Sequence, residues 1–139
     1  MATYPLQVIS LDGPVLDQQV KSVKLRTIDG DVEILARHMN YCTAIGMGTA
    51  EVTQEDGSKR EAACIGGMIL VMNGECKIYP TTWEWQDEID VKRAQRAKER
   101  AEEKLAKGNL SEVEKTAVEA KLYRALVRLS TAGNQSMGQ

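Results

Sequence analysis

Seven cationic side chains form the clearest chemical pattern in this sequence of 139 residues. Five of them follow one another at intervals of three and four: Arg93, Arg96, Arg100, Lys104 and Lys107. Arg124 and Arg128 lie four residues apart further along the chain. Such side chains make charge-assisted hydrogen bonds with carboxylates and phosphates, so the pattern indicates a surface for an acidic partner or a polyphosphate. The alternative is a solvated face paired with Glu99, Glu102 and Glu103, and the pattern alone leaves both open.

Residues that could bind a metal or act as nucleophiles are sparse. His38 is the single histidine, and its spacing from Cys42 matches no zinc motif, so no metal site is predicted. Cys64 lies close to Gly66-Gly67, which would suit a nucleophile beside an amide-rich turn. A buried structural thiol is the favoured interpretation, and a thiol enzyme stays as an alternative. We predict no catalytic residues and no required cofactor.

The cationic residues lie in a stretch rich in Ala, Glu, Lys and Arg that predicts two helices. Asp87 is expected to cap the first helix, and Gly108-Asn109 to end it. One face of the first helix is mostly alanine at helical spacing: Ala94, Ala97, Ala101 and Leu105. Ser111 and Glu114 have the spacing of a capping box that starts the second helix. The apolar face expected on the second helix comprises Val118, Leu122, Leu126 and Leu129, followed by a frayed tail from Gly133 to Gln139.

The short connection between these helices predicts an antiparallel hairpin about 30 Å long. Alanine buries little area, so the packing of the hairpin on other elements is expected to be weak and reversible. The four guanidinium groups of Arg93, Arg100, Arg124 and Arg128 could meet across the folded hairpin. They would repel one another unless an anion lay among them.

The first 85 residues predict a β structure with tight turns. Four turn dipeptides can supply positive φ: Asp12-Gly13, Asp29-Gly30, Asp56-Gly57 and Asn73-Gly74. Val15 to Leu25 alternates as a half-buried strand, and Met68, Leu70 and Met72 alternate before the last turn as in a hairpin. The fold class expected is an N-terminal antiparallel β-sandwich over 1–85, followed by a C-terminal antiparallel two-helix hairpin over 86–139.

Composition narrows the class of protein. The chain has 18 basic and 20 acidic residues, and its first 85 residues carry an excess of acidic side chains, so a nucleic-acid binder is disfavoured. A free-standing nucleotide or nucleic-acid binding module is therefore a low-ranked alternative. Hydrophobic residues make up 42% of the chain, enough for a core, yet no apolar run is long enough to cross a membrane. Three cysteines without a CxxC motif favour a reducing, cytoplasmic setting.

Several segments, in this order and spacing, closely resemble the epsilon subunit of bacterial F-type ATP synthases over nearly the whole chain. The segments are Ile34-Leu35 through His38 with Thr43-Ala44, Gly66-Gly67-Met68-Ile69-Leu70-Val71, Ile89-Asp90-Val91-Lys92-Arg93-Ala94, Lys98-Glu99-Arg100-Ala101-Glu102 and Arg124-Ala125-Leu126-Val127-Arg128-Leu129. The resemblance implies a non-catalytic subunit of the central stalk, peripheral on the cytoplasmic face of the bacterial plasma membrane. Its sandwich would bind the gamma subunit and the ring of c subunits, without inserting into the membrane or binding nucleic acid.

The resemblance also implies roles for particular residues. An extended hairpin would reach the alpha and beta subunits of the catalytic head and inhibit ATP hydrolysis, while ATP as a regulatory ligand would hold the hairpin folded. The residues that match the family's nucleotide motif are Ile89, Asp90, Arg93, Ala94, Arg100, Arg124 and Arg128. Asp31 and His38 match the contact with the c ring. Around His38 the family usually has glycine and proline where this chain has Glu33, Ala36, Arg37 and Asn40, so we expect the same role with an altered local shape.

Overall fold

The computed structural model describes the backbone of residues 2–137 and the side chains of residues 2–133. The chain divides into two compact units after Gln86, which we call the β unit and the helical unit. The sequence places this boundary one residue earlier, between Trp85 and Gln86. Each unit is described by itself.

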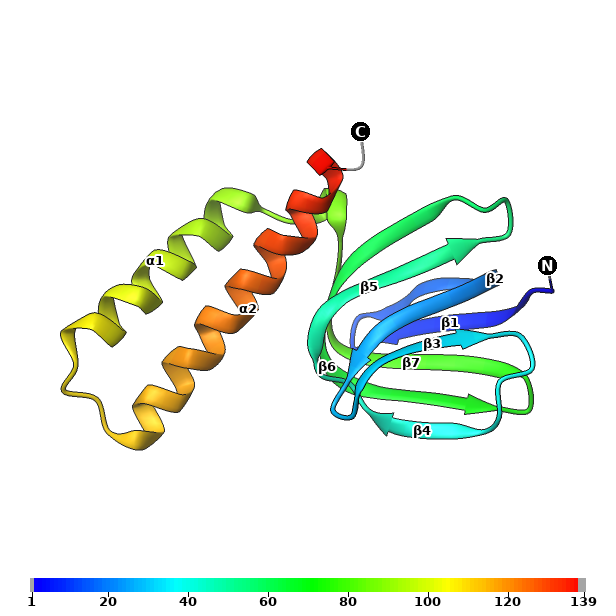
Figure 1. The fold of residues 1–139 in the computed structure, drawn as a ribbon, viewed down its shortest axis with the longest axis horizontal. Helices are drawn as coiled ribbons and strands as arrows, with labels where there is room; N and C mark the ends of the chain where they lie inside the picture. Colours follow the sequence, from blue (N-terminus) through cyan, green and yellow to red (C-terminus); the bar gives the residue numbers. More distant parts are fainter. Residues whose placement is uncertain (1, 138–139) are drawn as a thin grey trace. The chain divides into compact units, whose positions relative to one another are not determined.

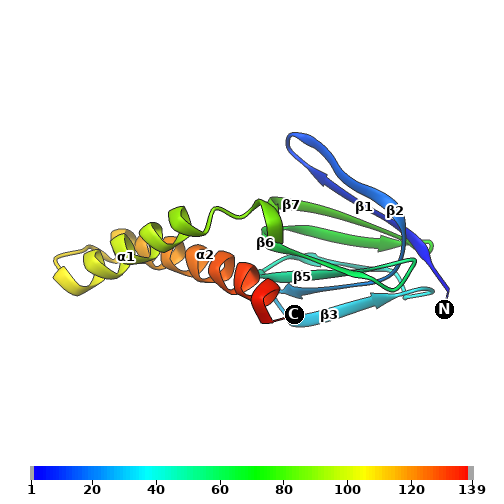
Figure 2. The same ribbon diagram turned by 90° about the horizontal axis from the view of Figure 1, so that it is seen from above.

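The β unit is a two-layered sheet structure whose hydrogen bonding closes on itself (Figures 1 and 2). Its strands are β1 (Tyr4–Ser10), β2 (Gly13–Thr27), β3 (Gly30–Leu35), β4 (Tyr41–Ala44), β5 (Met47–Gln54), β6 (Lys59–Met72) and β7 (Glu75–Trp85). All pairings are antiparallel except that of β1 with β7. Because β1 also pairs with β2, the ladder runs from β1 through β7, β6, β5 and β2 back to β1. The predicted antiparallel sandwich is confirmed.

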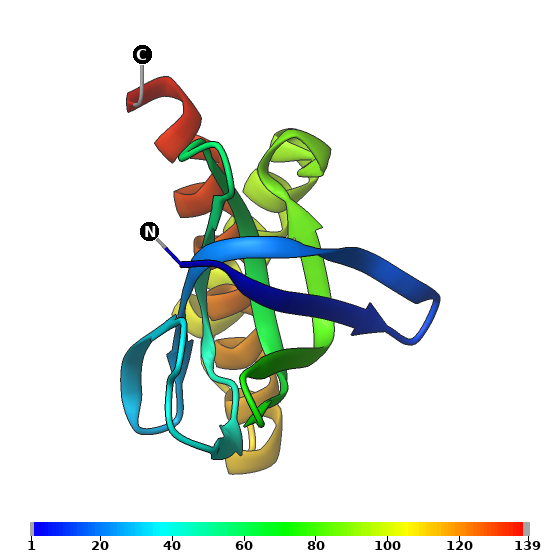
Figure 3. The same ribbon diagram turned by 90° about the vertical axis from the view of Figure 1, so that its right-hand side faces the viewer.

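All four predicted turn dipeptides lie between consecutive strands. Gly13, Gly30, Gly57 and Gly74 have φ values from +80° to +119°, the region that glycine adopts without steric cost. At the first of these turns the β1–β2 hairpin projects from the rest of the β unit, as Figure 3 shows in blue, and Leu11 at its tip is 95% exposed. The turns therefore form where the local sequence favours them, and they set the strand order.

The core lies between the two layers and contains no phenylalanine, as the composition requires. Its largest fully buried side chains include Leu6, Leu25, Ile34, Ile69 and Ile78. Each such side chain contributes about 1.5–3 kcal/mol to stability when removed from water. The buried Tyr4 hydroxyl donates a hydrogen bond to the Ile34 carbonyl at 2.5 Å, which ties β1 to β3.

The helical unit is an antiparallel hairpin of α1 (Val91–Lys107) and α2 (Glu112–Met137), preceded by a short 3-10 turn, η1 (Gln86–Glu88) (Figure 1). The predicted cap at Asp87 is wrong, because Asp90 occupies the N-cap of α1 and its side chain accepts a hydrogen bond from the Arg93 backbone N–H at 3.0 Å. Asp87 lies instead in η1, which separates the end of β7 from the helix. Gly108, with φ +71°, ends α1 as expected.

The start of α2 agrees with the predicted capping box. Ser111 Oγ accepts a hydrogen bond from the Glu114 backbone N–H at 3.2 Å and donates one to the Glu114 carboxylate at 3.1 Å. At the other end the helix continues through Gly133 to Met137, five residues further than predicted. The last two residues of the expected frayed tail, 138–139, lie outside the described residues.

Small residues form much of the contact between the two helices. Ala94 and Ala101 of α1 are both 4% exposed and lie seven residues apart. Val118 and Ala125 of α2 are also buried, at 8% and 1% exposed, and have the same spacing. In an antiparallel pair this spacing places Ala94 level with Ala125 and Ala101 level with Val118. Leu126 is 41% exposed, so the prediction that it belongs to the buried face is wrong. The buried face of α2 continues from Leu122 to Ala125 and not to Leu126, because an α-helix has 3.6 residues per turn.

Candidate functional site

The cationic stripe of α1 is exposed along its whole length. Among the described residues, none of its five members forms an ion pair with an acidic side chain: Arg93, Arg96, Arg100, Lys104 and Lys107. Glu99 instead accepts a hydrogen bond from Gln95, at 3.2 Å. The interpretation of a self-paired surface therefore does not hold for the described residues, and the stripe is available to an external anion.

The four arginines of the proposed nucleotide motif share one position relative to the contact between the helices. Each directly precedes a residue of the inner stripe: Arg93 before Ala94, Arg100 before Ala101, Arg124 before Ala125 and Arg128 before Leu129. In an antiparallel pair, equivalent flanking positions of the two helices line the same side of the contact. Helical geometry thus puts the four arginines along one edge of the folded hairpin. Arg93 and Arg100 are exposed, whereas Arg124 and Arg128 are half-buried.

The other three residues of that motif have structural roles in the helical unit. Ile89 is 8% exposed and Ala94 is 4% exposed, so both are buried side chains. Asp90 caps α1 through its carboxylate. An acid at the positive end of a helix dipole also stabilises the helix. The segment Ile89-Asp90-x-x-Arg93-Ala94 therefore fixes where α1 starts. It thereby also fixes the position on the helix from which the Arg93 side chain projects.

The two residues assigned to the ring contact are at opposite ends of β3. Asp31 lies beside the β2–β3 turn, whereas His38 follows the end of the strand. The four steps along the extended chain from Asp31 to Leu35 alone span about 13 Å. Asp31 Oδ1 accepts a hydrogen bond from Arg26 Nε at 3.3 Å, and Ile28 in the same turn is 68% exposed. The structure therefore brings Asp31 together with Arg26 and Ile28, and not with His38.

The loop around His38 keeps a left-handed residue although it lacks the family's glycine. Arg37 has φ +66°, a conformation that a non-glycine residue adopts only at a cost. The turn is closed by the His38 backbone N–H, which donates to the Leu35 carbonyl at 3.2 Å. His38 Nδ1 lies 2.7 Å from the Met39 carbonyl, and the His38 ring contacts Tyr41 edge-on.

A second exposed surface, which sequence reasoning missed, lies on β6 and β7. Met68, Leu70 and Met72 alternate with the buried Ile69 and Val71, so β6 is apolar on both of its faces here. We call the outer surface made by Met68, Leu70, Met72 and Tyr79 the β6–β7 face; Met68 pairs in register with Tyr79. The uninterrupted apolar run was the available signal, because a strand with one solvated face usually alternates.

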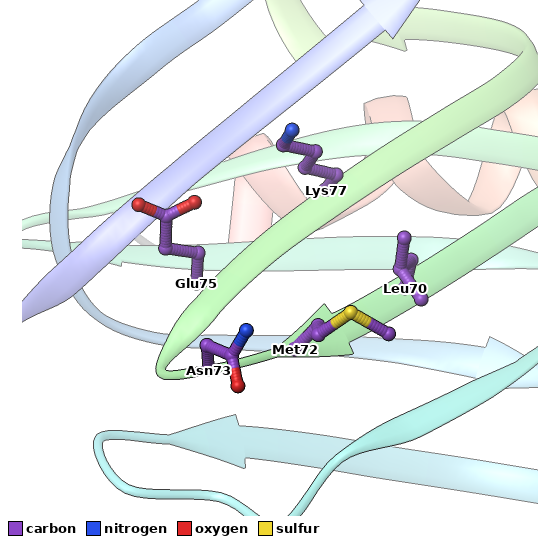
Figure 4. A pocket seen from close by; sticks show the side chains of 5 residues that line it. All are labelled: Leu70, Met72, Asn73, Glu75 and Lys77. Carbon is purple, nitrogen blue, oxygen red and sulfur yellow. The ribbon is translucent and has the colours of Figure 1, made fainter.

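An open hollow of about 300 Å³ marks one end of the β6–β7 face. Figure 4 shows its lining side chains, which are Leu70, Met72, Asn73, Glu75 and Lys77. A neighbouring hollow of about 230 Å³ shares Glu75 and Lys77. Apolar side chains flanked by one acid and one base suit a protein partner better than a small ligand.

The thiols of Cys64 and Cys76 are buried, and burial raises the pKa of each to about 12. A thiol of that pKa carries almost no thiolate near neutral pH, so neither suits nucleophilic chemistry. In the part of the chain that the structure describes, no cluster of His, Cys, Asp or Glu could hold a metal ion. Within the same residues, no helix has the length and apolar character needed to cross a membrane.

A closed β-sandwich followed by a cation-lined helical hairpin defines a two-domain protein whose exposed surfaces suit binding. Residues 3–86 match the family model described as ATP synthase, Delta/Epsilon chain, beta-sandwich domain, and residues 87–133 match that of its long alpha-helix domain. The chain belongs to this family. Its curated relatives make it an epsilon subunit of ATP synthase, a non-catalytic accessory subunit, which confirms the resemblance.

Two of the relatives match over nearly their full length. The ATP synthase epsilon chain of Caldicellulosiruptor bescii is 40% identical over 132 residues, covering 95% of each chain. That of Caldanaerobacter subterraneus is 37% identical over 130 residues, covering 94% of each chain. A relative from Acetobacterium woodii is named as sodium ion specific and is 36% identical over 99 residues, covering 71% of this chain and 74% of its own.

The fold is also similar to that of chains in solved ATP synthases. A chain in the mitochondrial ATP synthase of Euglena gracilis, described as OSCP/F1/c-ring, superposes with a TM-score of 0.82 at 25% identity. That match covers 95% of this chain and 82% of the other. A chain in the central stalk and c-ring structure from Tetrahymena thermophila, at 11% identity and a TM-score of 0.65, shares the fold alone.

Proposed function

We propose that this subunit couples rotation of the central stalk to ATP synthesis and restrains ATP hydrolysis through its helical unit. The observation that supports this function best is the row of exposed, unpaired cations on α1. Like charges in a row repel one another, and the binding of an anionic partner offsets this repulsion. In the extended hairpin the partner would be acidic surface of the alpha and beta subunits.

ATP is the ligand proposed for the folded hairpin. Its phosphates would lie among Arg93, Arg100, Arg124 and Arg128, which share one edge only while α1 packs on α2. Because a ligand shifts an equilibrium by its differential affinity for two states, ATP would favour the folded and non-inhibitory state. The alanine contact between the helices adds little packing energy of its own to the folded state, so a bound anion can decide the balance. ATP would act as a regulatory ligand and not as a required cofactor.

The β unit is proposed to hold the subunit on the stalk. The β6–β7 face, with its half-exposed methionines and Tyr79, suits the gamma subunit, because an apolar surface of this kind is normally covered by a protein. The turn that bears Ile28 and Asp31 suits the polar loops of the c ring. These contacts would place the subunit at the cytoplasmic face of the bacterial plasma membrane, as a peripheral component.

Calorimetric titration of the full chain with ATP tests the nucleotide site. Arg93→Gln and Arg124→Gln are expected to weaken ATP binding at least tenfold, since each removes a charge-assisted hydrogen bond worth about 1.5–3 kcal/mol. Lys92→Gln is the matched control, because Lys92 is exposed on the same turn of α1 but lies off this edge. Equal weakening by the Lys92 variant, or no heat with millimolar ATP, would refute the proposed site.

Assembly with the remaining subunits tests the regulatory role. In the complete complex, a chain ending at Gln86 should raise the ATP hydrolysis rate and leave assembly intact. The Arg124→Gln variant, whose change lies on α2 and outside the cation row of α1, should be more inhibited than the unmodified complex at high ATP concentration, because ATP no longer holds the hairpin folded. Unchanged hydrolysis after removal of the helical unit would contradict an inhibitory role while leaving the stalk role in place.

A further inference from the structure

An exposed arginine, Arg26, lies near the end of β2, just before the β2–β3 turn. Arg26 and Asp31 are directly opposite each other in the register of β2 and β3. Arg26 Nε donates to Asp31 Oδ1 at 3.3 Å, and the two side chains are 50% and 58% exposed. Lys59 Nζ and Glu51 Oε1 form another ion pair in the β unit, at 3.2 Å.

Two glycines of the neighbouring chain segment make room for the stem of Arg26. A Cβ atom added to Gly48 would meet Arg26 Cβ at 3.1 Å, and one added to Gly46 would meet Arg26 Cγ at 3.3 Å. Both distances are tighter than ordinary contacts, so the methylene chain of Arg26 lies against these two backbones. Side chains at either position would push the arginine away from its present path. The glycines therefore restrict where the guanidinium group can lie.

We propose that Arg26 is a positioning residue that holds the Asp31 carboxylate in the orientation used to bind the c ring. The inference rests on the proposed ring contact and adds the residue that orients the carboxylate for this contact. Asp31 would bind a basic group of the partner through the oxygen atoms that Arg26 leaves accessible, while the adjacent Ile28 packs on an apolar patch. An exposed ion pair adds about 0–1 kcal/mol to stability, so its expected effect is on orientation and not on folding.

The test measures binding of the full chain to the detergent-purified c ring of the same ATP synthase. Asp31→Asn and Arg26→Gln are each expected to weaken binding about tenfold, as expected for a lost charge-assisted contact. The double variant should bind no more weakly than Asp31→Asn alone, because Arg26 acts through Asp31. Gly48→Ala should reproduce the loss without changing any charge. Lys59→Gln, which breaks the Lys59–Glu51 ion pair (3.2 Å), is the matched control and should bind normally.

A second measurement, on the free full chain, tests the positioning role of Arg26 separately from the ring contact of Asp31. The NMR signal of the Arg26 Nε–H group should shift and exchange faster in Asp31→Asn, while the melting temperature of each variant stays within a few degrees. Additive losses in the double variant, or an unchanged Arg26 signal, would overturn the positioning role. Normal binding by Asp31→Asn would overturn the ring contact itself, and with it this inference.

Discussion

At the scale of single residues, Arg37 shows how the chain keeps a backbone shape without the residue that best suits it. Its φ of +66° belongs to the left-handed region, which costs an ordinary residue about 1–2 kcal/mol. Leu35, His38 and Tyr41 hold the turn through one backbone hydrogen bond and one ring contact. The strain is therefore retained in the folded state and not relieved by a change of turn.

Arg37→Gly is expected to stabilise the β unit by up to about 1 kcal/mol. Glycine removes the left-handed strain, and its greater freedom in the unfolded chain offsets part of that gain. Urea unfolding followed by circular dichroism would measure the shift in midpoint. The matched control is Arg60→Gly, at a β6 position where φ is not positive, which should destabilise. A lower midpoint for Arg37→Gly would show that the Arg37 side chain contributes contacts of its own.

Because of the buried thiols, the stability of the β unit should fall as the pH becomes alkaline. The pKa of Cys64 and of Cys76 is about 12 in the folded chain, against an ordinary value of 9. Stability is therefore complete below pH 9 and falls as the pH rises toward 12, since the unfolded chain releases these protons first. Each thiol should contribute a slope of about 1.4 kcal/mol per pH unit in that range.

Unfolding free energies at several pH values between 8 and 11 would measure this slope. Cys64→Ala should lower stability overall, because it shortens a buried side chain, and should make the alkaline slope shallower. Cys42→Ser is the control, because Cys42 is exposed and its replacement should leave the slope unchanged. Identical slopes in both variants would contradict the assignment to the buried thiols.

At the scale of elements, the bend in β6 depends on two successive glycines. Gly66 and Gly67 have φ values of +69° and +105°, and they lie where β6 pairs with β7 in constant register, Ile65 with Thr82 and Gly67 with Pro80. A Cβ atom on Gly67 would lie 2.0 Å from the Tyr79 carbonyl oxygen. The close approach lets β6 change direction and present Met68 outward while Ile69 stays in the core.

Gly67→Ala should destabilise the β unit by about 3 kcal/mol or more, since it adds both a backbone clash and left-handed strain. Gly74→Ala is the matched control, because its φ is +80° but no atom lies within 4 Å of an added Cβ. That control should cost about 1–2 kcal/mol from strain alone. Thermal melting of both variants gives the comparison, and equal losses would show that the close approach is unimportant.

The elements that the sequence predicted well are those set by local chemistry. The turn glycines, the Ser111 cap and the alanine stripe of α1 follow from neighbours a few residues apart. The misplaced cap at Asp87 arose because Asp87 and Asp90 are equally good caps locally, and the length of β7 decides between them. The role of Arg26 was not predictable, since it requires the lateral pairing of β2 with β3 and the glycines beyond.

At the scale of the whole molecule, the two units differ in how they are stabilised. Every residue of the main core cluster lies between Tyr4 and Trp85. The contact of α1 with α2 includes alanines, which bury far less area than leucine or isoleucine. A short helical hairpin with such a contact is marginal in water without further packing.

A fragment ending at Gln86 is therefore expected to fold alone, with one cooperative unfolding transition. The complementary fragment, residues 87–139, should be only partly helical at 25 °C, because α1 and α2 depend on the alanine contact and on their caps. Circular dichroism of both fragments and of the full chain provides the measurement. A fully helical and cooperatively melting hairpin fragment would contradict the marginal stability argued here.

Closure of the strand ladder has a consequence for the newly synthesised subunit before it joins the ATP synthase. Among the strands of the described residues, β3 and β4, of six and four residues, are the two that pair with a single neighbouring strand. The unpaired backbone groups of an edge strand can pair with a strand of another chain and so promote aggregation, and short edge strands offer few such groups. A copy released from the ribosome ahead of its partners can thus wait in a crowded cell without seeding fibrils.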